Sequence, residues 1–183
     1  MEKIKITREM LAEAEDYLPC AAKEAWVEEN AAKCFDRLAV KVDEDPLPPM
    51  YMVNEGIKRR YLMAAFAKLY MKQEYEADER DPALMGAEDY DKWAGSHVFS
   101  QMERLKRDAE ARDKCFDLLD DFRDLEKRFF AHIAGLLAVQ NDAVVRQAQY
   151  STASLQALPG LLEQLKALQD GKGEADGAAD SSL

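Results

Sequence analysis

The sequence predicts an all-α fold: a single-domain bundle of about five to seven helices that ends in a disordered acidic tail. Apolar residues recur every three to four positions along most of the 183-residue chain, which is the period of an α-helix. No alternation of apolar and polar residues reaches strand length with turn residues on both sides. The chain holds 8 glycines and 6 prolines, so few positions interrupt a helix.

The expected helices are bounded by capping and breaking residues. Thr7 is a good N-cap residue, and Pro19 both ends the first helix and suits the first turn of the second. Asn141-Asp142 has the composition of a helix end and a new N-cap, and Pro159-Gly160 opens the last helix, which Gly171 closes. The helices are expected at about 7–17, 19–38, 50–75 (from Met50 or Asn54), 87–107, 109–140, 143–157 and 159–170, with 87–107 and 109–140 either separate or continuous.

Two segments break the helical pattern. The first, 43–50, contains three prolines within four residues, which fix φ and remove backbone donors, and Val40–Val42 before it is interpreted as a short extended piece. The second, 76–86, is acidic and contains Asp81-Pro82. We assign residues 1–170 to one helical domain and 171–183, rich in Gly, Ala, Asp and Ser, to a disordered tail.

A row of aspartates, here called the acidic ladder, is the first candidate binding surface. It lies opposite the apolar stripe of the predicted helix 109–140, within about 80° of arc and over roughly 16 Å. Two interpretations stand: the row imitates a phosphate backbone or docks in a basic groove, or it is a solvated face neutralised by nearby Lys and Arg. The ladder consists of Asp113, Asp117, Asp120, Asp121 and Asp124, and the candidate counter-charges are Lys114, Arg123, Lys127 and Arg128.

Two further segments are candidate docking surfaces. The acidic segment 76–91 follows a basic stretch at 57–75, so the two either neutralise each other or offer a charge-matched site. A leucine segment near the C-terminus has a 3-4-3 spacing and either folds back over its own bundle or fills a groove on a partner or a second copy. The carboxylates proposed for partner binding are Glu76, Asp78, Glu79 and Asp81, and the leucines are Leu158, Leu161, Leu165 and Leu168.

Catalytic and cofactor chemistry has no support in the residue pattern, so we predict no catalytic residue, no metal and no cofactor. Neither His97 nor His132 belongs to a Glu-x-x-His motif, and no Gly-rich phosphate loop, HExxH or GxSxG motif occurs. The cysteines match neither a zinc framework nor a disulfide ladder and are interpreted as reduced thiols, Cys34 and Cys115 in the core. Cys20 differs because it falls in the first turn of a predicted helix.

The charge balance restricts the class of partner. A net charge of -11 argues against direct binding to nucleic acid or to an anionic membrane and favours a basic protein. The N-terminal stretch 1–10 is charged and lacks an apolar signal region, and no apolar run reaches the length of a membrane span. We therefore expect a cytoplasmic protein.

These observations lead to three hypotheses about function. The leading one is a non-enzymatic protein-binding module, an adaptor, assembly factor or accessory subunit, that acts through a helical, acidic surface and forms a homo-oligomer if the leucine segment pairs with itself. The first alternative is an acidic inhibitor that mimics nucleic acid in the site of a basic enzyme, of the phage or mobile-element anti-defence type. The second is an enzyme whose site is scattered along the sequence. In composition the chain is similar to many small acidic accessory proteins of bacteria and phages.

Overall fold

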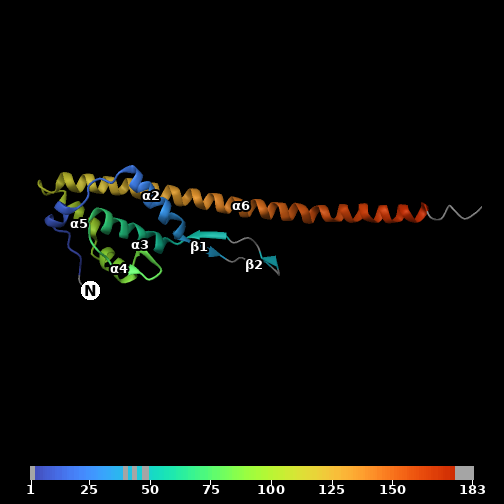
Figure 1. Ribbon diagram of the computed structural model, residues 1–183, viewed down its shortest axis with the longest axis horizontal. Helices are drawn as coiled ribbons and strands as arrows, with labels where there is room; N and C mark the ends of the chain where they lie inside the picture. The colour runs from blue at the N-terminus through green and yellow to red at the C-terminus, as the bar shows by residue number, and fades with distance from the viewer. Residues whose placement is uncertain (1–2, 39–40, 43–44, 47–49, 176–183) are drawn as a thin grey trace, which may run out of the picture. The chain divides into compact units, whose positions relative to one another are not determined.

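The computed structural model of the protein describes residues 3–38, 41–42, 45–46 and 50–175 (Figure 1). The chain divides into two compact units, of which unit 1 comprises Met1–Leu38 and Tyr51–Val139, and unit 2 comprises Ala39–Met50 and Gln140–Leu183. The fold is mostly helical, as predicted, but it is not purely α, because the described residues also form three two-stranded sheets.

The elements, in chain order, are as follows. The helical elements are α1 (Arg8–Glu13), α2 (Cys20–Ala31), the 3₁₀ turn η1 (Ala32–Cys34), α3 (Glu55–Ala65), the π-helical turn η2 (Phe66–Tyr70), α4 (Ala87–Gly95), α5 (Val98–Leu105) and α6 (Arg112–Ala175). The strands are β1 (Phe35–Leu38), β2 (Lys41–Val42), β3 (Asp45–Pro46), β4 (Met50–Val53), β5 (Ala77–Asp78) and β6 (Asp81–Met85). The pairs are β1 with β4, β2 with β3, and β5 with β6.

Predicted helix starts are confirmed where a capping residue marks them. The Thr7 hydroxyl accepts a hydrogen bond from the backbone N–H of Met10 at 3.3 Å and so caps α1. Helix α2 begins directly after Pro19. Of the two predicted starts for α3, Asn54 is confirmed, since its side-chain oxygen accepts from the backbone N–H of Ile57 at 3.0 Å.

Predicted helix ends are less accurate, because long-range contacts end the helices early. Helix α1 stops at Glu13 rather than near residue 17, and the next segment leaves the helix so that the N–H of Glu15 donates to the carbonyl of Tyr70 at 2.7 Å. The prediction of one helix over 19–38 is wrong beyond Cys34. There the chain turns into β1, which pairs with β4, and the carbonyl of Cys34 accepts from the N–H of Asn54 at 2.7 Å.

The acidic break at 76–86 is a β-hairpin rather than an open loop. Strands β5 and β6 are antiparallel, with Ala77 opposite Met85. The hairpin closes where the N–H of Gly86 donates to the carbonyl of Glu76 at 2.7 Å. A Cβ atom on Gly86 would stand 2.8 Å from that carbonyl oxygen, so only glycine fits at this position without a shift of the backbone.

The predicted helix over 87–107 is two helices, α4 and α5, separated at Ser96 and His97. His97 has a φ of 53°, in the left-handed region, which ends the helical path of α4. The N-terminal segment binds at this break, since the N–H of Ile4 donates to the Ser96 hydroxyl at 2.8 Å. The side-chain amide of Gln101 donates to the carbonyls of Ile4 at 2.9 Å and of Ser96 at 2.7 Å. A local sequence pattern does not reveal this contact across the chain.

Helix α6 replaces three predicted helices. The predicted boundary at Asn141-Asp142 is wrong, because Asp142 forms an ion pair with Arg146 at 2.6 Å, an i,i+4 contact that favours the helix. The predicted start at Pro159 is also wrong. A proline costs a helix one backbone hydrogen bond, and the flanking residues are rich in Ala, Leu and Gln, which favour its continuation. The predicted tail at 171–183 overlaps the end of α6, and residues 176–183 lie outside the described part.

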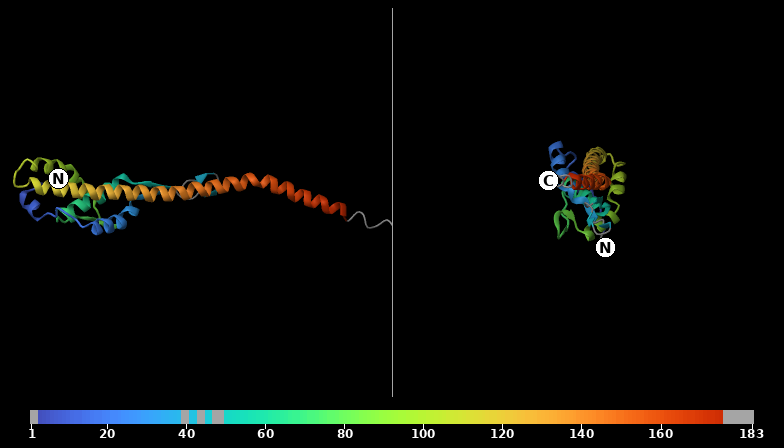
Figure 2. Two further views of the ribbon diagram at one scale, coloured as in Figure 1. Left: turned by 90° about the horizontal axis from the view of Figure 1, so that it is seen from above. Right: turned by 90° about the vertical axis from the view of Figure 1, so that its right-hand side faces the viewer.

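The core of unit 1 lies among α2, α3, α4, α5 and the unit 1 part of α6, which gather together in the ribbon views (Figures 1 and 2). The apolar stripe predicted on α6 is confirmed as buried, with Cys115, Leu118, Leu125 and Phe129 at 0% exposure. In the part of the chain that the structure describes, no helix combines the length and the apolar character that crossing a lipid bilayer requires.

Candidate functional site

The acidic ladder divides into an exposed and a covered part. Asp113, Asp117 and Asp120 are exposed on α6, whereas Asp121 and Asp124 are partly covered. Two members of the exposed part have a nearby counter-charge: Asp120 pairs with Arg123 at 3.0 Å, and Asp113 contacts Arg112 at 3.2 Å. Of the predicted counter-charges, Arg123 and Arg128 contact the ladder, whereas Lys114 pairs with Asp16.

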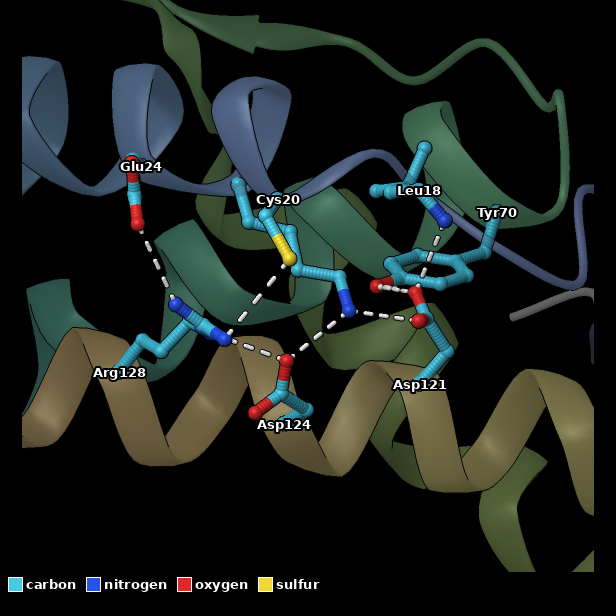
Figure 3. A network of polar contacts seen from close by, with 8 residues as sticks. Leu18, Cys20, Glu24, Tyr70, Asp121, Asp124 and Arg128 are labelled. Carbon is cyan, nitrogen blue, oxygen red and sulfur yellow. Dashed lines mark hydrogen bonds and ion pairs between the residues drawn. The ribbon is translucent and has the colours of Figure 1, made fainter.

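The covered part of the ladder belongs to a polar network around Lys23 (Figure 3). Lys23 lies on the buried face of α2, and its ammonium contacts Asp121 at 2.5 Å and Asp124 at 3.0 Å. Asp121 also accepts from the hydroxyl of Tyr70 at 2.9 Å and from the backbone N–H of Leu18 at 3.0 Å. The side chains of Lys23 and Asp121 are 3% and 9% exposed, so this is a buried, hydrogen-bonded ion pair.

Hydrogen bonds within the network favour the ionised forms of Lys23 and Asp124. Burial acts to lower the pKa of Lys23, but its hydrogen bonds to Asp121 and Asp124 outweigh this effect and raise that pKa. The hydrogen bonds from Lys23 and Arg128 lower the pKa of Asp124. Burial, followed by the bond to Asp121, raises the pKa of the Tyr70 phenol, which therefore remains a donor. These groups stabilise the packing of α2 on α6.

The outer edge of the network contains Arg128 and Cys20. Figure 3 shows the Arg128 guanidinium between Asp124, which it contacts at 2.9 Å, and Glu24 at 3.5 Å. The thiol of Cys20 lies 4.0 Å from the same guanidinium and is exposed at the start of α2. Cys34 and Cys115 are buried, as predicted, and burial raises the pKa of Cys34 to about 12.

The predicted acidic segment is partly neutralised within unit 1. Asp78 pairs with Arg60 at 2.5 Å, and Asp81 pairs with Lys33 at 2.8 Å. Asp81 also accepts from the hydroxyl of Tyr61 at 2.7 Å. Its burial acts to raise its pKa, but the hydrogen bonds from Lys33 and Tyr61 lower it overall. The side chains of Glu76 and Glu79 are exposed, so these two remain available to a partner.

The predicted leucine segment lies outside the described side chains. The backbone at Leu158, Leu161, Leu165 and Leu168 belongs to α6.

The structure also contains an apolar cavity that the sequence did not predict, here called the anchor cavity. It has a volume of about 330 Å³. Helices α3, α4, α5 and α6 of unit 1 each contribute to its walls. Its apolar lining is Leu62, Met63, Tyr90, Phe99, Leu119 and Phe122, and its charged lining is Arg59, Glu103, Arg123 and Glu126.

Aromatic packing fixes the shape of the anchor cavity. Phe122 is buried and stacks on Phe99 with ring centroids 5.6 Å apart and an interplanar angle of 21°. The buried Phe66 ring packs against both, with its centroid 4.7 Å from that of Phe99 and 5.1 Å from that of Phe122. Phe99 is nevertheless 37% exposed, so part of its ring faces solvent at the edge of the cavity. An exposed aromatic ring held by buried aromatic rings is a rigid contact surface.

The charged lining surrounds this apolar surface with both signs of charge. Arg123 bridges Glu103 at 3.3 Å and Asp120 at 3.0 Å. Arg59 and Glu126 form no ion pair with any residue that the structure describes. They can therefore pair with charges on a partner without first breaking an internal ion pair.

The polar groups of the anchor cavity are two carboxylates, two guanidinium groups and the Tyr90 phenol. Its described lining contains no cysteine, histidine, serine or lysine. Across the described residues, no group of three or more His, Cys, Asp and Glu side chains is placed to hold a metal ion. The arrangement can bury an apolar side chain and pair charges at the edge.

The network and the cavity differ in how much of each the sequence signals. Lys23 lies four residues before Val27 and so shares the apolar face of α2. A lysine on the apolar face of a helix signals a buried carboxylate partner, because a buried charge needs a counter-charge. The cavity has no such signal, because its walls come from helices far apart in the sequence. No protein-family model, no curated protein and no solved structure matches this chain.

Proposed function

We propose that this protein is a non-enzymatic protein-binding module, an adaptor, assembly factor or accessory subunit, whose partner inserts an apolar side chain into the anchor cavity. The observation that carries the proposal is the exposed Phe99 ring at the edge of a mainly apolar cavity. Protein interfaces concentrate their binding energy in such pockets, where an aromatic or aliphatic anchor is shielded from water. A cavity of about 330 Å³ is at the small end of ligand sites and suits one or two apolar side chains.

The charges around the cavity define the rest of the partner. An acidic residue beside its apolar anchor would pair with Arg59, and a basic residue would pair with Glu126. At longer range the net charge of -11 attracts a partner with a basic surface, and the exposed Asp113, Asp117 and Asp120 add to that field. The apolar cavity and the charges around it together favour a basic protein that carries an apolar anchor residue over a small metabolite as the partner.

The nucleic-acid-mimic hypothesis receives less support from the same contacts. A mimic needs a row of unpaired carboxylates at phosphate-like spacing. In the ladder, Asp121 and Asp124 are bound by Lys23, and Asp120 is paired with Arg123. A variant that tests the mimic must therefore change only Asp113, Asp117 and Asp120, because changing Asp124 would also disturb the packing of α2.

Site-specific photo-crosslinking in the native host tests the proposed function. A photoreactive benzoylphenylalanine replaces Phe99 at the cavity edge or, as the control, Phe116, which is 45% exposed on α6 but is not part of the cavity lining. We expect a discrete crosslinked protein from position 99 that is absent from position 116. Mass spectrometry then identifies the partner for binding measurements with purified proteins. Identical crosslinks from both positions, or none from position 99, would contradict the proposal.

A further inference from the structure

Helices α3 and α6 run antiparallel where they form walls of the anchor cavity. Near the start of α3, the ammonium of Lys58 lies 4.5 Å from the centroid of the Phe130 ring on α6. About two turns further along the chain, at the start of η2, the ring centroid of Phe66 lies 5.1 Å from that of Phe122. The cavity therefore has one end near the start of α3 and another end where Phe66 and Phe122 meet.

Two opposite charges lie at the first end, and the aromatic surface lies at the second. Arg59 is the first residue that α3 contributes to the lining, and Glu126 is the last that α6 contributes. Because the two helices are antiparallel, these charges lie on two walls at the same end of the cavity. Phe99 lies at the second end, where its ring packs against Phe66 and Phe122. An occupant that contacts Phe99 with an apolar group therefore has its charged groups at the end that contains Arg59 and Glu126.

The charges at the first end are available to an occupant, whereas the other charges of the lining are not. Arg123 already pairs with Glu103 at 3.3 Å and with Asp120 at 3.0 Å. The side chains of Arg59 and Glu126 form no hydrogen bond or ion pair with any residue in the described part of the chain. The occupant thus meets one free cation and one free anion beside an apolar surface.

The last residue of a protein chain fits this arrangement better than an internal residue does. Its α-carboxylate and its side chain are attached to the same carbon atom, so both fit within a cavity of about 330 Å³. A guanidinium such as that of Arg59 binds a carboxylate through two parallel hydrogen bonds. An internal anchor would need an acidic neighbour, which reduces the positive charge that the net charge of -11 attracts. A terminal carboxylate is present in every protein, however basic.

We propose that the occupant of the anchor cavity is the C-terminal residue of a basic partner protein. Its large apolar side chain contacts Phe99, and its α-carboxylate binds Arg59. A Lys or Arg side chain one or two residues before the partner's C-terminus pairs with Glu126. This inference rests on the proposed function, because it names the part of the partner that enters the cavity.

Two short peptides test the proposal with the full chain. The probe is acetyl-Lys-Gly-Lys-Phe with a free C-terminal carboxylate, and its control is the same peptide with a C-terminal amide. The amide carries one more net positive charge, so the net charge of -11 attracts it more strongly, and a preference for the acid must come from a local contact. Binding is followed by NMR of isotope-labelled methionine methyl groups. Met63 belongs to the cavity lining, whereas Met52, which is 54% exposed, lies outside it.

We expect the free acid to shift the Met63 methyl signal, without a comparable shift of Met52, and to bind about tenfold more tightly than the amide. Arg59→Gln should bring the two affinities within about twofold of each other. Arg104→Gln is the matched control, since it removes an exposed cation of α5 that is outside the lining, and it should keep the tenfold difference. Glu126→Gln should weaken the binding of the acid about threefold.

Equal affinities for the acid and the amide would overturn the proposal, as would a preference for the acid that survives Arg59→Gln. The absence of a Met63 shift with either peptide would also overturn it. Phe99→Ala separates this failure from a failure of the proposed function. If the acid and the amide shift Met63 equally and Phe99→Ala abolishes both shifts, an apolar anchor still docks in the cavity, but its recognition does not use a terminal carboxylate.

Discussion

Replacing Lys23 with methionine tests whether the covered part of the acidic ladder is structural. Methionine keeps most of the apolar stem but removes the ammonium that contacts Asp121 and Asp124. Asp124 is 43% exposed and keeps its contact with Arg128, so its charge stays solvated and paired. Asp121 is 9% exposed and keeps only the neutral donors of Leu18 and Tyr70. The variant therefore leaves one uncompensated buried charge.

We expect Lys23→Met to lower the free energy of unfolding by about 3 kcal/mol, at the lower end of the cost of breaking a buried ion pair. With an ordinary urea dependence this lowers the unfolding midpoint by about 1.5 M, measured by circular dichroism at 222 nm. Adding Asp121→Asn removes the orphaned charge but keeps an acceptor for Tyr70, and should recover about half of the loss.

Arg112→Met is the matched control, since it removes a cation from an exposed contact, and it should cost less than about 1 kcal/mol. If Lys23→Met were to unfold within about 0.5 kcal/mol of the wild type, the assignment of the network as a buried ion pair would be refuted.

Three further predictions concern unit 1. Gly86→Ala should destabilise the fold by about 1–3 kcal/mol in urea unfolding, because the new Cβ meets a backbone oxygen; Gly135→Ala, with open space at its Cβ inside α6, should instead stabilise by roughly 0.5–1 kcal/mol. Stability should fall as the pH drops below about 4, because the pKa values of Asp81 and Asp124 are lower in the folded protein than in the unfolded chain. These two carboxylates therefore contribute their full stabilisation above the unfolded-state pKa, and this stabilisation is lost as the pH falls through the folded-state pKa. A free energy of unfolding that is level or rising from about pH 5 to 3 contradicts this. In the native protein only the exposed thiol of Cys20 should react quickly with Ellman's reagent, whereas all 3 thiols should react in denaturant.

The sequence was most informative about local structure. The caps at Thr7 and Asn54 and the apolar stripe of α6 depend on residues within a few turns of each other, and all three are confirmed. The extended piece predicted at Val40–Val42 contains strand β2. The pairs β1–β4 and β5–β6 and the break at His97 were missed, because strand pairing and the binding of the N-terminal segment are not visible in local sequence patterns.

The candidate site shows the same division. The arc of five aspartates was read from helical spacing, yet which of them are exposed depends on α2, which covers Asp121 and Asp124. The anchor cavity exists because Leu62, Phe99 and Phe122 meet from separate helices, and helical periodicity identifies each as apolar without saying which of them stays exposed.

Isothermal titration with the purified partner tests the account most directly. Phe99→Ala should weaken binding about 30-fold, which corresponds to about 2 kcal/mol for a central aromatic contact. Phe116→Ala, with the same change on a surface outside the cavity, should leave the Kd within about threefold of the wild type. Equal affinities for the wild type and a correctly folded Phe99→Ala variant would contradict partner docking at the anchor cavity.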